Sequence, residues 1–273
     1  MKLLRLTATV CGLFSSKTLC ACRTVQKVKD DELRDVVTTL DQILHEASAN
    51  FVLANMPSCK LMSEEDASDS GGAPSLKEGE WLVVDPLDGS NNYALSLPGY
   101  GFMAAHLVHG KVNGSVVVLP EHDLYLVVDD GEMVISQPFV PEQVASSASV
   151  YYAYPPKLTV EAIESRSDLI DLIDRSSSGI YRYGSSCIGL YNLIRGKHAA
   201  FIGHGIRIWD ALAYFPLLER FGIFANYHID ALGLVLVASW DKSFVDEACG
   251  IIAKKEMIQF TGLTRELNLV ISA

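Results

Sequence analysis

The chain has 273 residues, of which 49% are hydrophobic and 20% charged, and its formal net charge at pH 7 is −11. Such a chain can bury a core in one large domain or two closely packed halves, and its composition excludes a disordered polypeptide. The acidic balance, without a basic stretch, argues against a nucleic-acid polymer as partner. Clustered carboxylates are tolerated where divalent cations neutralise them.

The first 22 residues allow two interpretations. A lysine and an apolar run up to Leu19-Cys20 weakly resemble a secretory or lipoprotein signal, although Arg5 and Ser15-Ser16-Lys17 interrupt the run. The alternative, which we favour, is an amphipathic first helix. The apolar residues on one side of that helix are Leu3, Leu4, Leu6, Val10 and Phe14.

Two further features bear on the compartment. No segment has the roughly 20 uninterrupted apolar residues of a membrane span, so we expect no membrane partner. The six cysteines are scattered, without a CxxC pair or a histidine at zinc spacing. This usage predicts free thiols in a reducing cytoplasm.

The predicted elements alternate between helices and strands. Residues 38–54 predict a helix, residues 63–80 an acidic loop, and Trp81–Val84 a buried strand that ends at Asp85-Pro86. Apolar runs divided by glycines predict an antiparallel meander over residues 102–108, 115–119, 124–128 and 133–135. The second half predicts helices at 158–174, 185–196, 210–221 and 244–254 and a strand at 232–238. This alternation indicates layered α and β structure, with a subdomain boundary near residue 140, around Pro138 and Pro141.

The segment Asp85-Pro86-Leu87-Asp88-Gly89-Ser90 is the most informative motif. Two carboxylates lie three residues apart directly after a buried strand, and the proline fixes the turn between them. This arrangement directs both carboxylates and a backbone carbonyl at one hard cation, and the N–H groups of Gly89 and Ser90 at a phosphate oxygen. An ordinary Asp-Pro turn is the alternative.

Three other acidic segments support the interpretation of this motif as a cation-binding turn. They are Asp35–Asp41 before a helix, Ser63-Glu64-Glu65-Asp66, and Trp209-Asp210 at a predicted helix start. Each also has an ordinary explanation, since acidic runs are commonly solvated loops and such residues commonly cap helices.

In this order the motifs resemble the inositol monophosphatase superfamily, which has D-x-V-T-x-x-D, a Glu-Glu pair, D-P-[IL]-D-G-[ST], a Gly-[Ser/Thr] helix start and a Trp-Asp helix start. The matching segments are Asp35–Asp41, Glu64-Glu65, Asp85–Ser90, Gly184-Ser185-Ser186 and Trp209-Asp210. The resemblance spans about residues 30–222. It implies an α+β fold, a layered α/β/α/β/α sandwich forming a single catalytic domain over residues 1–273. A homodimer and sensitivity to lithium are also implied.

The resemblance further implies residue roles in Mg²⁺-dependent hydrolysis of a small phosphate monoester by a metal-activated water. The implied metal ligands are Glu64, Asp85, Asp88, Asp210 and the Leu87 carbonyl. Asp41 and Ser90 would orient and deprotonate the water, with Glu64 also in the catalytic set, and Gly89 and Ser90 would bind phosphate. Ser185 and Ser186 would touch the rest of the substrate, an inositol, sugar or nucleotide phosphate.

The sequence departs from the family pattern in two places. Leu212 and Tyr214 are bulky where the pattern W-D-x-A-A-G has small residues. Gly203 stands where many relatives carry a ring-contacting Glu, so His204 or Arg207 is a candidate contact for a more acidic substrate. The alternative function, supported mainly by the altered Trp-Asp segment, is a catalytically weak or inactive family member that acts as a ligand-binding or regulatory protein.

Overall fold

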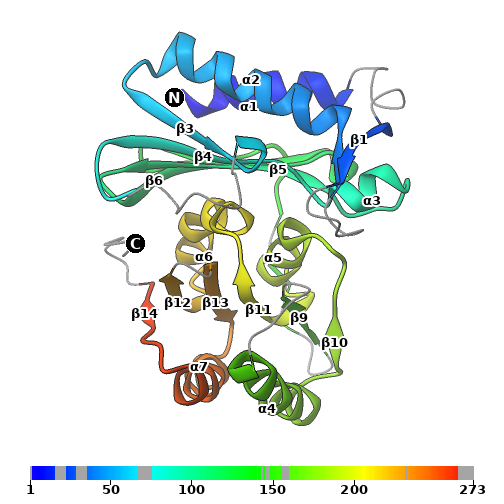
Figure 1. Ribbon diagram of the computed structural model, residues 1–273, viewed down its shortest axis with the longest axis vertical. Coiled ribbons are helices and arrows are strands. Elements are labelled where there is room, and N and C mark those ends of the chain that lie inside the picture. Colours follow the sequence, from blue (N-terminus) through cyan, green and yellow to red (C-terminus); the bar gives the residue numbers. More distant parts are fainter. Residues whose placement is uncertain are drawn as a thin grey trace.

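The computed structural model describes residues 2–15, 23–28, 36–66, 76–139, 141–142, 144, 148–154, 160–230 and 233–263. These residues stack in five layers, helices alternating with sheets (Figure 1). The predicted layered α/β/α/β/α architecture is therefore confirmed.

The outer layer next to the N-terminus contains two helices, α1 (Leu3–Ser15) and α2 (Thr39–Asn55). They cover a six-stranded sheet, which has the strand order β3-β4-β5-β6-β7-β8. Its strands are β3 (Cys59–Ser63), β4 (Glu80–Asp88), β5 (Gly101–Val108), β6 (Lys111–Leu119), β7 (Leu124–Asp129) and β8 (Glu132–Ile135). From β4 to β8 every pair is antiparallel, which confirms the meander.

The middle helical layer contains α5 (Ser186–Ile194) and α6 (Phe215–Arg220), and the opposite outer layer contains α4 (Val160–Ser176) and α7 (Lys242–Glu256) (Figure 1). Between these layers lies a second six-stranded sheet. Its strands, in sheet order, are β10 (Ile180–Tyr181), β9 (Ser149–Ala153), β11 (His198–Ile206), β13 (Gly233–Ser239), β12 (Phe224–Asp230) and β14 (Thr261–Gly262). A short antiparallel pair, β1 (Val25–Val28) and β2 (Val36–Thr38), precedes α2. The chain passes between the sheets after Ile135, and we propose the subdomain boundary there.

Strand β4 shows why a continuous apolar run forms an inner strand. Side chains alternate across a sheet, so Leu82 and Val84 pack toward α1 and α2, whereas Trp81 and Val83 pack toward the middle helices. Each face of the first sheet therefore packs against its own hydrophobic core. A third hydrophobic core lies between the second sheet and the outer helices α4 and α7. This double burial fixes the strand that leads into the Asp85–Ser90 motif.

The helix predicted for the N-terminal segment is confirmed as α1, with Leu3, Leu6, Val10 and Phe14 buried and Leu4 half-buried. Its first free N–H group, that of Leu3, donates a 2.9 Å hydrogen bond to Asp129 Oδ2 in β7. None of the helices in the described part of the chain combines the length and hydropathy needed to cross a bilayer. All four described cysteines are free thiols; Cys20 and Cys22 lie outside the described residues.

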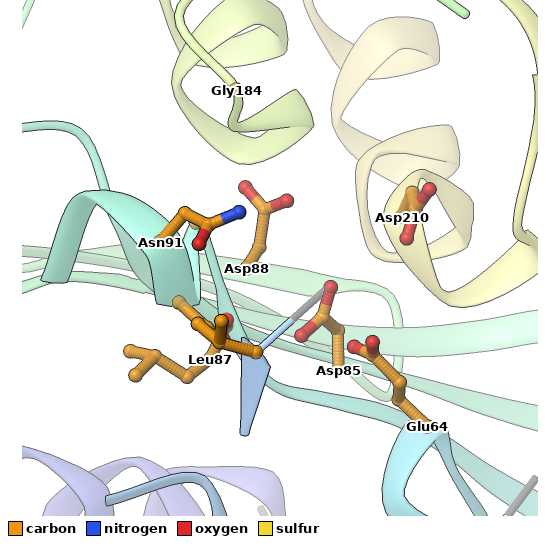
Figure 2. A pocket seen from close by; sticks show the side chains of 10 residues that line it. Glu64, Asp85, Leu87, Asp88, Asn91, Gly184 and Asp210 are labelled. Carbon is orange, nitrogen blue, oxygen red and sulfur yellow. The ribbon is translucent and has the colours of Figure 1, made fainter. Parts of the chain in front are cut away.

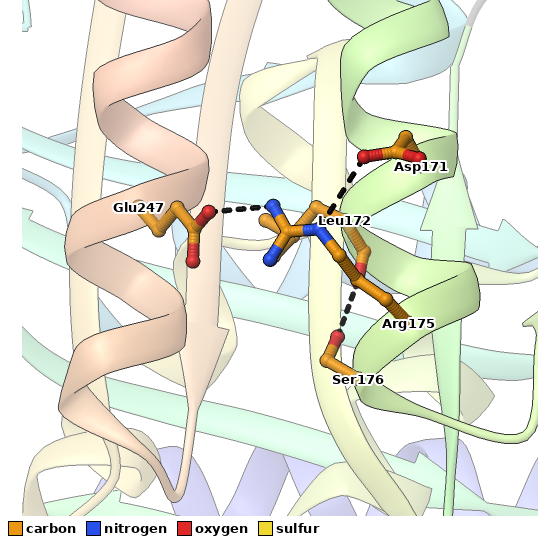
Figure 3. A network of polar contacts seen from close by, with 5 residues as sticks. All are labelled: Asp171, Leu172, Arg175, Ser176 and Glu247. Carbon is orange, nitrogen blue, oxygen red and sulfur yellow. Dashed lines mark hydrogen bonds and ion pairs between the residues drawn. The ribbon is translucent and has the colours of Figure 1, made fainter.

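The outer helices α4 and α7 are also linked through exposed charges (Figure 3). Arg175 Nη2 donates to Glu247 Oε1 at 2.6 Å and Arg175 Nε to Asp171 Oδ2 at 3.3 Å. Because both partners are exposed, this network adds little to the packing of the two helices.

Three sequence-based boundaries were wrong. Strand β4 does not stop at Asp85 but continues to Asp88 through an irregular register. The predicted helix 210–221 is two short 3₁₀ turns followed by α6, since Pro216 cannot donate the i→i−4 bond that would join them. Residues 203–206, for which no strand was predicted, belong to β11.

Candidate metal and phosphate site

A polar cavity of about 130 Å³ opens where β4 ends, between the first sheet and the middle helical layer. Carboxylates from three separate segments face it (Figure 2). Glu64 follows β3, Asp85 and Asp88 end β4, and Asp210 lies in the 3₁₀ turn before α6. The cavity is lined by Val36, Glu64, Asp85, Leu87, Asp88, Gly89, Ser90, Asn91, Gly184 and Asp210.

The end of β4 turns sharply because of two local features. The register with β5 is broken between Asp85 and Asp88, which leaves the Pro86-Leu87 backbone out of the regular ladder. Gly89 then adopts a left-handed conformation with φ of 86°. A Cβ atom at that position would lie 2.5 Å from the Gly99 carbonyl oxygen, so only glycine fits. The chain is thereby turned into the short helix α3 (Ser90–Ala94).

The cavity concentrates the negative charge of four carboxylates, those of Glu64, Asp85, Asp88 and Asp210. Burial, followed by repulsion from Glu64, Asp88 and Asp210, raises the pKa of Asp85 well above its ordinary value. Burial and the charges of Asp88 and Glu64 likewise raise the pKa of Asp210. Asp85 Oδ1 is buried without a hydrogen-bond partner among the described residues. Oxygen donors from several segments and an unpaired buried carboxylate oxygen fit a hard divalent cation.

The carboxylate of Asp88 also accepts hydrogen bonds from the residues at the start of α5. Its Oδ2 accepts the N–H of Cys187 at 2.7 Å and the hydroxyl of Ser185, and its Oδ1 accepts the N–H of Ser186 at 3.2 Å. Burial raises the pKa of Asp88 to about 6, although these hydrogen bonds lower it. Ser185 and Ser186, expected from the resemblance to touch substrate, are buried and donate to Asp88 through the Ser185 hydroxyl and the Ser186 backbone N–H, while Gly184 lines the cavity.

Asp41 and Ser90 are brought together as the resemblance implied. Ser90 Oγ donates to Asp41 Oδ1 at 2.6 Å and also lies 2.7 Å from the Leu87 carbonyl oxygen. Asp41 Oδ2 accepts the N–H of Thr38 at 2.7 Å and its hydroxyl at 2.5 Å, which closes a capping box at the start of α2. Burial raises the pKa of Asp41 despite these bonds. Asp35, in the same motif, lies outside the described residues.

The proposed contact through His204 was wrong. His204 is buried in β11, where Nε2 lies 2.8 Å from Glu256 Oε1 and Nδ1 lies 3.0 Å from Tyr152 Oη. A Cβ atom on Gly203 would lie 2.5 Å from Ile206 Cδ1, so a glutamate there would need the core to move. Arg207 is exposed, and its N–H donates to Asp210 Oδ2 at 3.0 Å.

Leu212 and Tyr214 do not enter the cavity. Both are fully buried in the core between the sheets, and Tyr214 Oη donates to the Cys187 carbonyl at 2.8 Å. The bulky residues therefore fill the interior behind Asp210 and leave the cavity open.

The sequence interpretation assigned no role to Thr38 or Asn91. Thr38 holds Asp41, and Asn91 lines the cavity. The Thr-x-x-Asp spacing was the available signal for Thr38, and adjacency to the Asp85–Ser90 motif was the signal for Asn91.

Comparison with known proteins gives a consistent result. The family model described as "Inositol monophosphatase family" matches residues 9–267. The "Nus factor SuhB" of Pasteurella multocida is 24% identical over 66% of this chain and 67% of its own length. The "Inositol-1-monophosphatase SuhB" of Mycobacterium tuberculosis is 22% identical over 75% and 74%. A lithium-soaked structure of Staphylococcal inositol monophosphatase-1 aligns with a TM-score of 0.71 at 17% identity, covering 91% of this chain and 92% of that one.

Proposed function

Since this chain belongs to the inositol monophosphatase family, we propose that it hydrolyses a small phosphate monoester with the help of Mg²⁺. The observation that carries the proposal is the carboxylate cavity, in which Asp85 Oδ1 is buried and unpaired among the described residues. Without a bound cation, the mutual repulsion of these buried carboxylates costs free energy.

The ligands we propose for Mg²⁺ are the carboxylates of Glu64, Asp85, Asp88 and Asp210 and the Leu87 carbonyl. When bound, Mg²⁺ would offset the charge of the phosphate, lower the pKa of an attacking water and stabilise the leaving oxygen. Because Ser90 has one hydroxyl hydrogen and Asp41 is the charged acceptor, that hydrogen points to Asp41 and leaves the Leu87 oxygen available to a cation.

We propose that Ser90 and Asp41 accept the proton of the attacking water in sequence. Ser90 lines the cavity, whereas Asp41 lies behind it, so the hydroxyl passes its hydrogen to Asp41 Oδ1 as it receives one from the water. Thr38 holds the other oxygen of Asp41 in place. A raised pKa makes Asp41 a better proton acceptor than an exposed aspartate.

The remaining contacts concern the substrate. The N–H groups of Gly89 and Ser90, at the turn into α3, are the proposed donors to phosphate oxygens. Ser185 and Ser186 are proposed to act on substrate through Asp88, because both donate to that carboxylate. The proposed assembly is a homodimer in the cytoplasm; free cysteines are compatible with that compartment. Sedimentation at two protein concentrations tests the dimer.

The regulatory alternative loses its main support. It depended on Leu212 and Tyr214 distorting the Trp-Asp segment, and both side chains pack away from the cavity. One relative is named a Nus factor, but the cavity here retains every proposed ligand.

The experiment is a phosphate-release assay on inositol 1-phosphate, fructose 1,6-bisphosphate and 3′-phosphoadenosine 5′-phosphate. The proposal expects release from at least one substrate with Mg²⁺ and none after chelation. Release that persists under chelation would reject the metal role, and no release from a broad panel of phosphorylated metabolites would reject the hydrolase.

A further inference from the structure

A second group of ligand-type side chains lies on the first sheet. Cys59 in β3, Glu80 in β4 and His106 in β5 each place one potential ligand atom within 4.8 Å of the other two. His106 Nε2 lies 2.8 Å from Glu80 Oε1, and Ser58 Oγ donates to Glu80 Oε2 at 2.7 Å. These groups lie on the face covered by α1 and α2, because Cys59 packs in the same core as Leu82 and Val84.

This group is separate from the carboxylate cavity. Cys59 pairs with Glu80 across the parallel strands β3 and β4, five residues before Glu64 and Asp85, respectively. Five residues of extended strand span about 17 Å, so one ion cannot serve both places. The two sites would nonetheless sit at opposite ends of the same pair of strands.

The chemistry of the three side chains differs from that of the cavity. A thiolate and an imidazole are ligands that Zn²⁺ and its neighbours favour, whereas Mg²⁺ requires oxygen donors. We propose that Cys59, Glu80 and His106 form a binding site for a Zn²⁺-class divalent transition-metal ion, with water as the remaining ligand. This inference goes beyond the proposed hydrolysis and does not depend on it.

The geometry needs only small movements to accept such an ion. Bonds of about 2.0–2.3 Å in a tetrahedral site place ligand atoms about 3.3–3.8 Å apart. The histidine and glutamate atoms would separate slightly, and the sulfur would approach from at most 4.8 Å. The His106 and Glu80 side chains are 16% and 25% exposed, which leaves an approach from solvent.

The thiol proton of Cys59 and the Lys2 ammonium group are positive partners with which a metal ion would compete at this site. Burial and the charge of Glu80 raise the pKa of the Cys59 thiol to about 12, and Lys2 lies close enough to lower the pKa of both Cys59 and Glu80. A divalent ion would replace the thiol proton and compete with the Lys2 ammonium group. The alternative to a metal site is a hydrogen-bonded pair of His106 and Glu80 beside the protonated thiol of Cys59.

Cobalt(II) titration of the full-length, reduced, chelator-treated protein distinguishes these possibilities. Excess Mg²⁺ keeps the carboxylate cavity filled, and carboxylates give no sulfur-to-cobalt charge-transfer band. The proposal expects such a band to saturate at one Co²⁺ per chain and to be bleached by Zn²⁺. The band should vanish in Cys59→Ser and persist in Cys249→Ser, which alters another buried free thiol.

Two further variants cover a failure of Cys59→Ser to fold. Loss of a residue that only hydrogen-bonds to a metal ligand typically weakens metal binding about 10–100-fold. Because His106 and Glu80 are proposed as ligands themselves, His106→Gln and Glu80→Gln should each weaken Co²⁺ binding at least about ten-fold. Absence of the band at millimolar Co²⁺, its persistence in folded Cys59→Ser, or an unchanged apparent Kd in both other variants would overturn the proposal. Phosphate release is not a readout, so its outcome leaves this test unaffected.

Discussion

Ser90 Oγ lies 2.6 Å from Asp41 Oδ1 and donates a hydrogen bond to it, although the two residues are 49 positions apart in the sequence. Ser90 is the first residue of α3 at the cavity wall, and Asp41 lies in the first turn of α2 behind it. The bond therefore connects solvent in the cavity to a buried carboxylate whose other oxygen is fixed by Thr38.

Ser90→Ala should lower kcat by about 10²-fold or more and leave KM and Mg²⁺ dependence nearly unchanged, because the cavity carboxylates remain. The variant also removes a hydrogen bond that lowers the pKa of Asp41, so the acidic limb of the kcat–pH profile should move to higher pH. Steady-state kinetics across pH measures both effects. Ser90→Thr is the matched control and should retain most activity; equal loss in both variants would contradict the hydroxyl's role.

The metal-free protein should lose stability as pH rises from about 4 through 6 and beyond. The carboxyl groups of Asp85 and Asp210 have strongly raised pKa values when folded, and the pKa of Asp88 is raised to about 6. Each binds more protons folded than unfolded in this window, so the free energy of unfolding falls as the protons leave. Mg²⁺ should offset the resulting repulsion. We expect the rise in Tm caused by Mg²⁺ to grow with pH; a rise that is constant across the window would contradict this electrostatic account.

Arg207→Ala should weaken substrates with a second anionic group more than simple monophosphates. Arg207 is exposed beside Asp210, so the contact is solvated and its loss should cost at most about 1 kcal/mol, or about five-fold in kcat/KM. The comparison uses inositol 1-phosphate, fructose 1,6-bisphosphate and 3′-phosphoadenosine 5′-phosphate. Equal effects on all three would show that Arg207 does not recognise the substrate.

Lithium should inhibit phosphate release at fixed Mg²⁺. A lithium-soaked inhibitory complex is known for a Staphylococcal structure of the same fold, and the cavity here offers oxygen ligands that a small monovalent cation can occupy. Dose–response curves against lithium and, as a control, sodium measure the effect. Equal response to both salts would mean that ionic strength, not site occupancy, is responsible.

The motifs that sequence analysis recovered are local. Asp85, Leu87, Asp88 and Gly89 lie within one turn whose shape follows from a buried strand, a proline and a glycine, so their common direction is predictable. The five-layer fold followed from the family resemblance, and helix α2 from its apolar spacing. The pairing of Asp41 with Ser90 spans 49 residues and came from the resemblance alone.

The errors arose where tertiary packing decides the outcome. His204 follows Gly203 in the sequence and was a candidate substrate contact, but β9 and β13 pair with both sides of its strand and bury it. Strand β12 was missed although Ala225, Tyr227 and Ile229 alternate with polar residues, a period-two signal that was available. The inward turn of Ser185 depends on Asp88, 97 residues away, which no local pattern contains.

Metal binding by the carboxylate cavity is tested most directly by the initial rate of phosphate release as a function of Mg²⁺ in wild type and in Asp85→Asn. Asp85 is preferable to Asp88 because Asp88 also caps α5, and an amide there would face donor groups. We expect a saturable Mg²⁺ dependence in wild type and almost no release from Asp85→Asn. That variant should stay folded, and its metal-free Tm should fall less than that of wild type as pH rises, because one repelling carboxyl group is gone. Wild-type rates with unchanged Mg²⁺ dependence in a folded Asp85→Asn protein would contradict metal binding by the cavity.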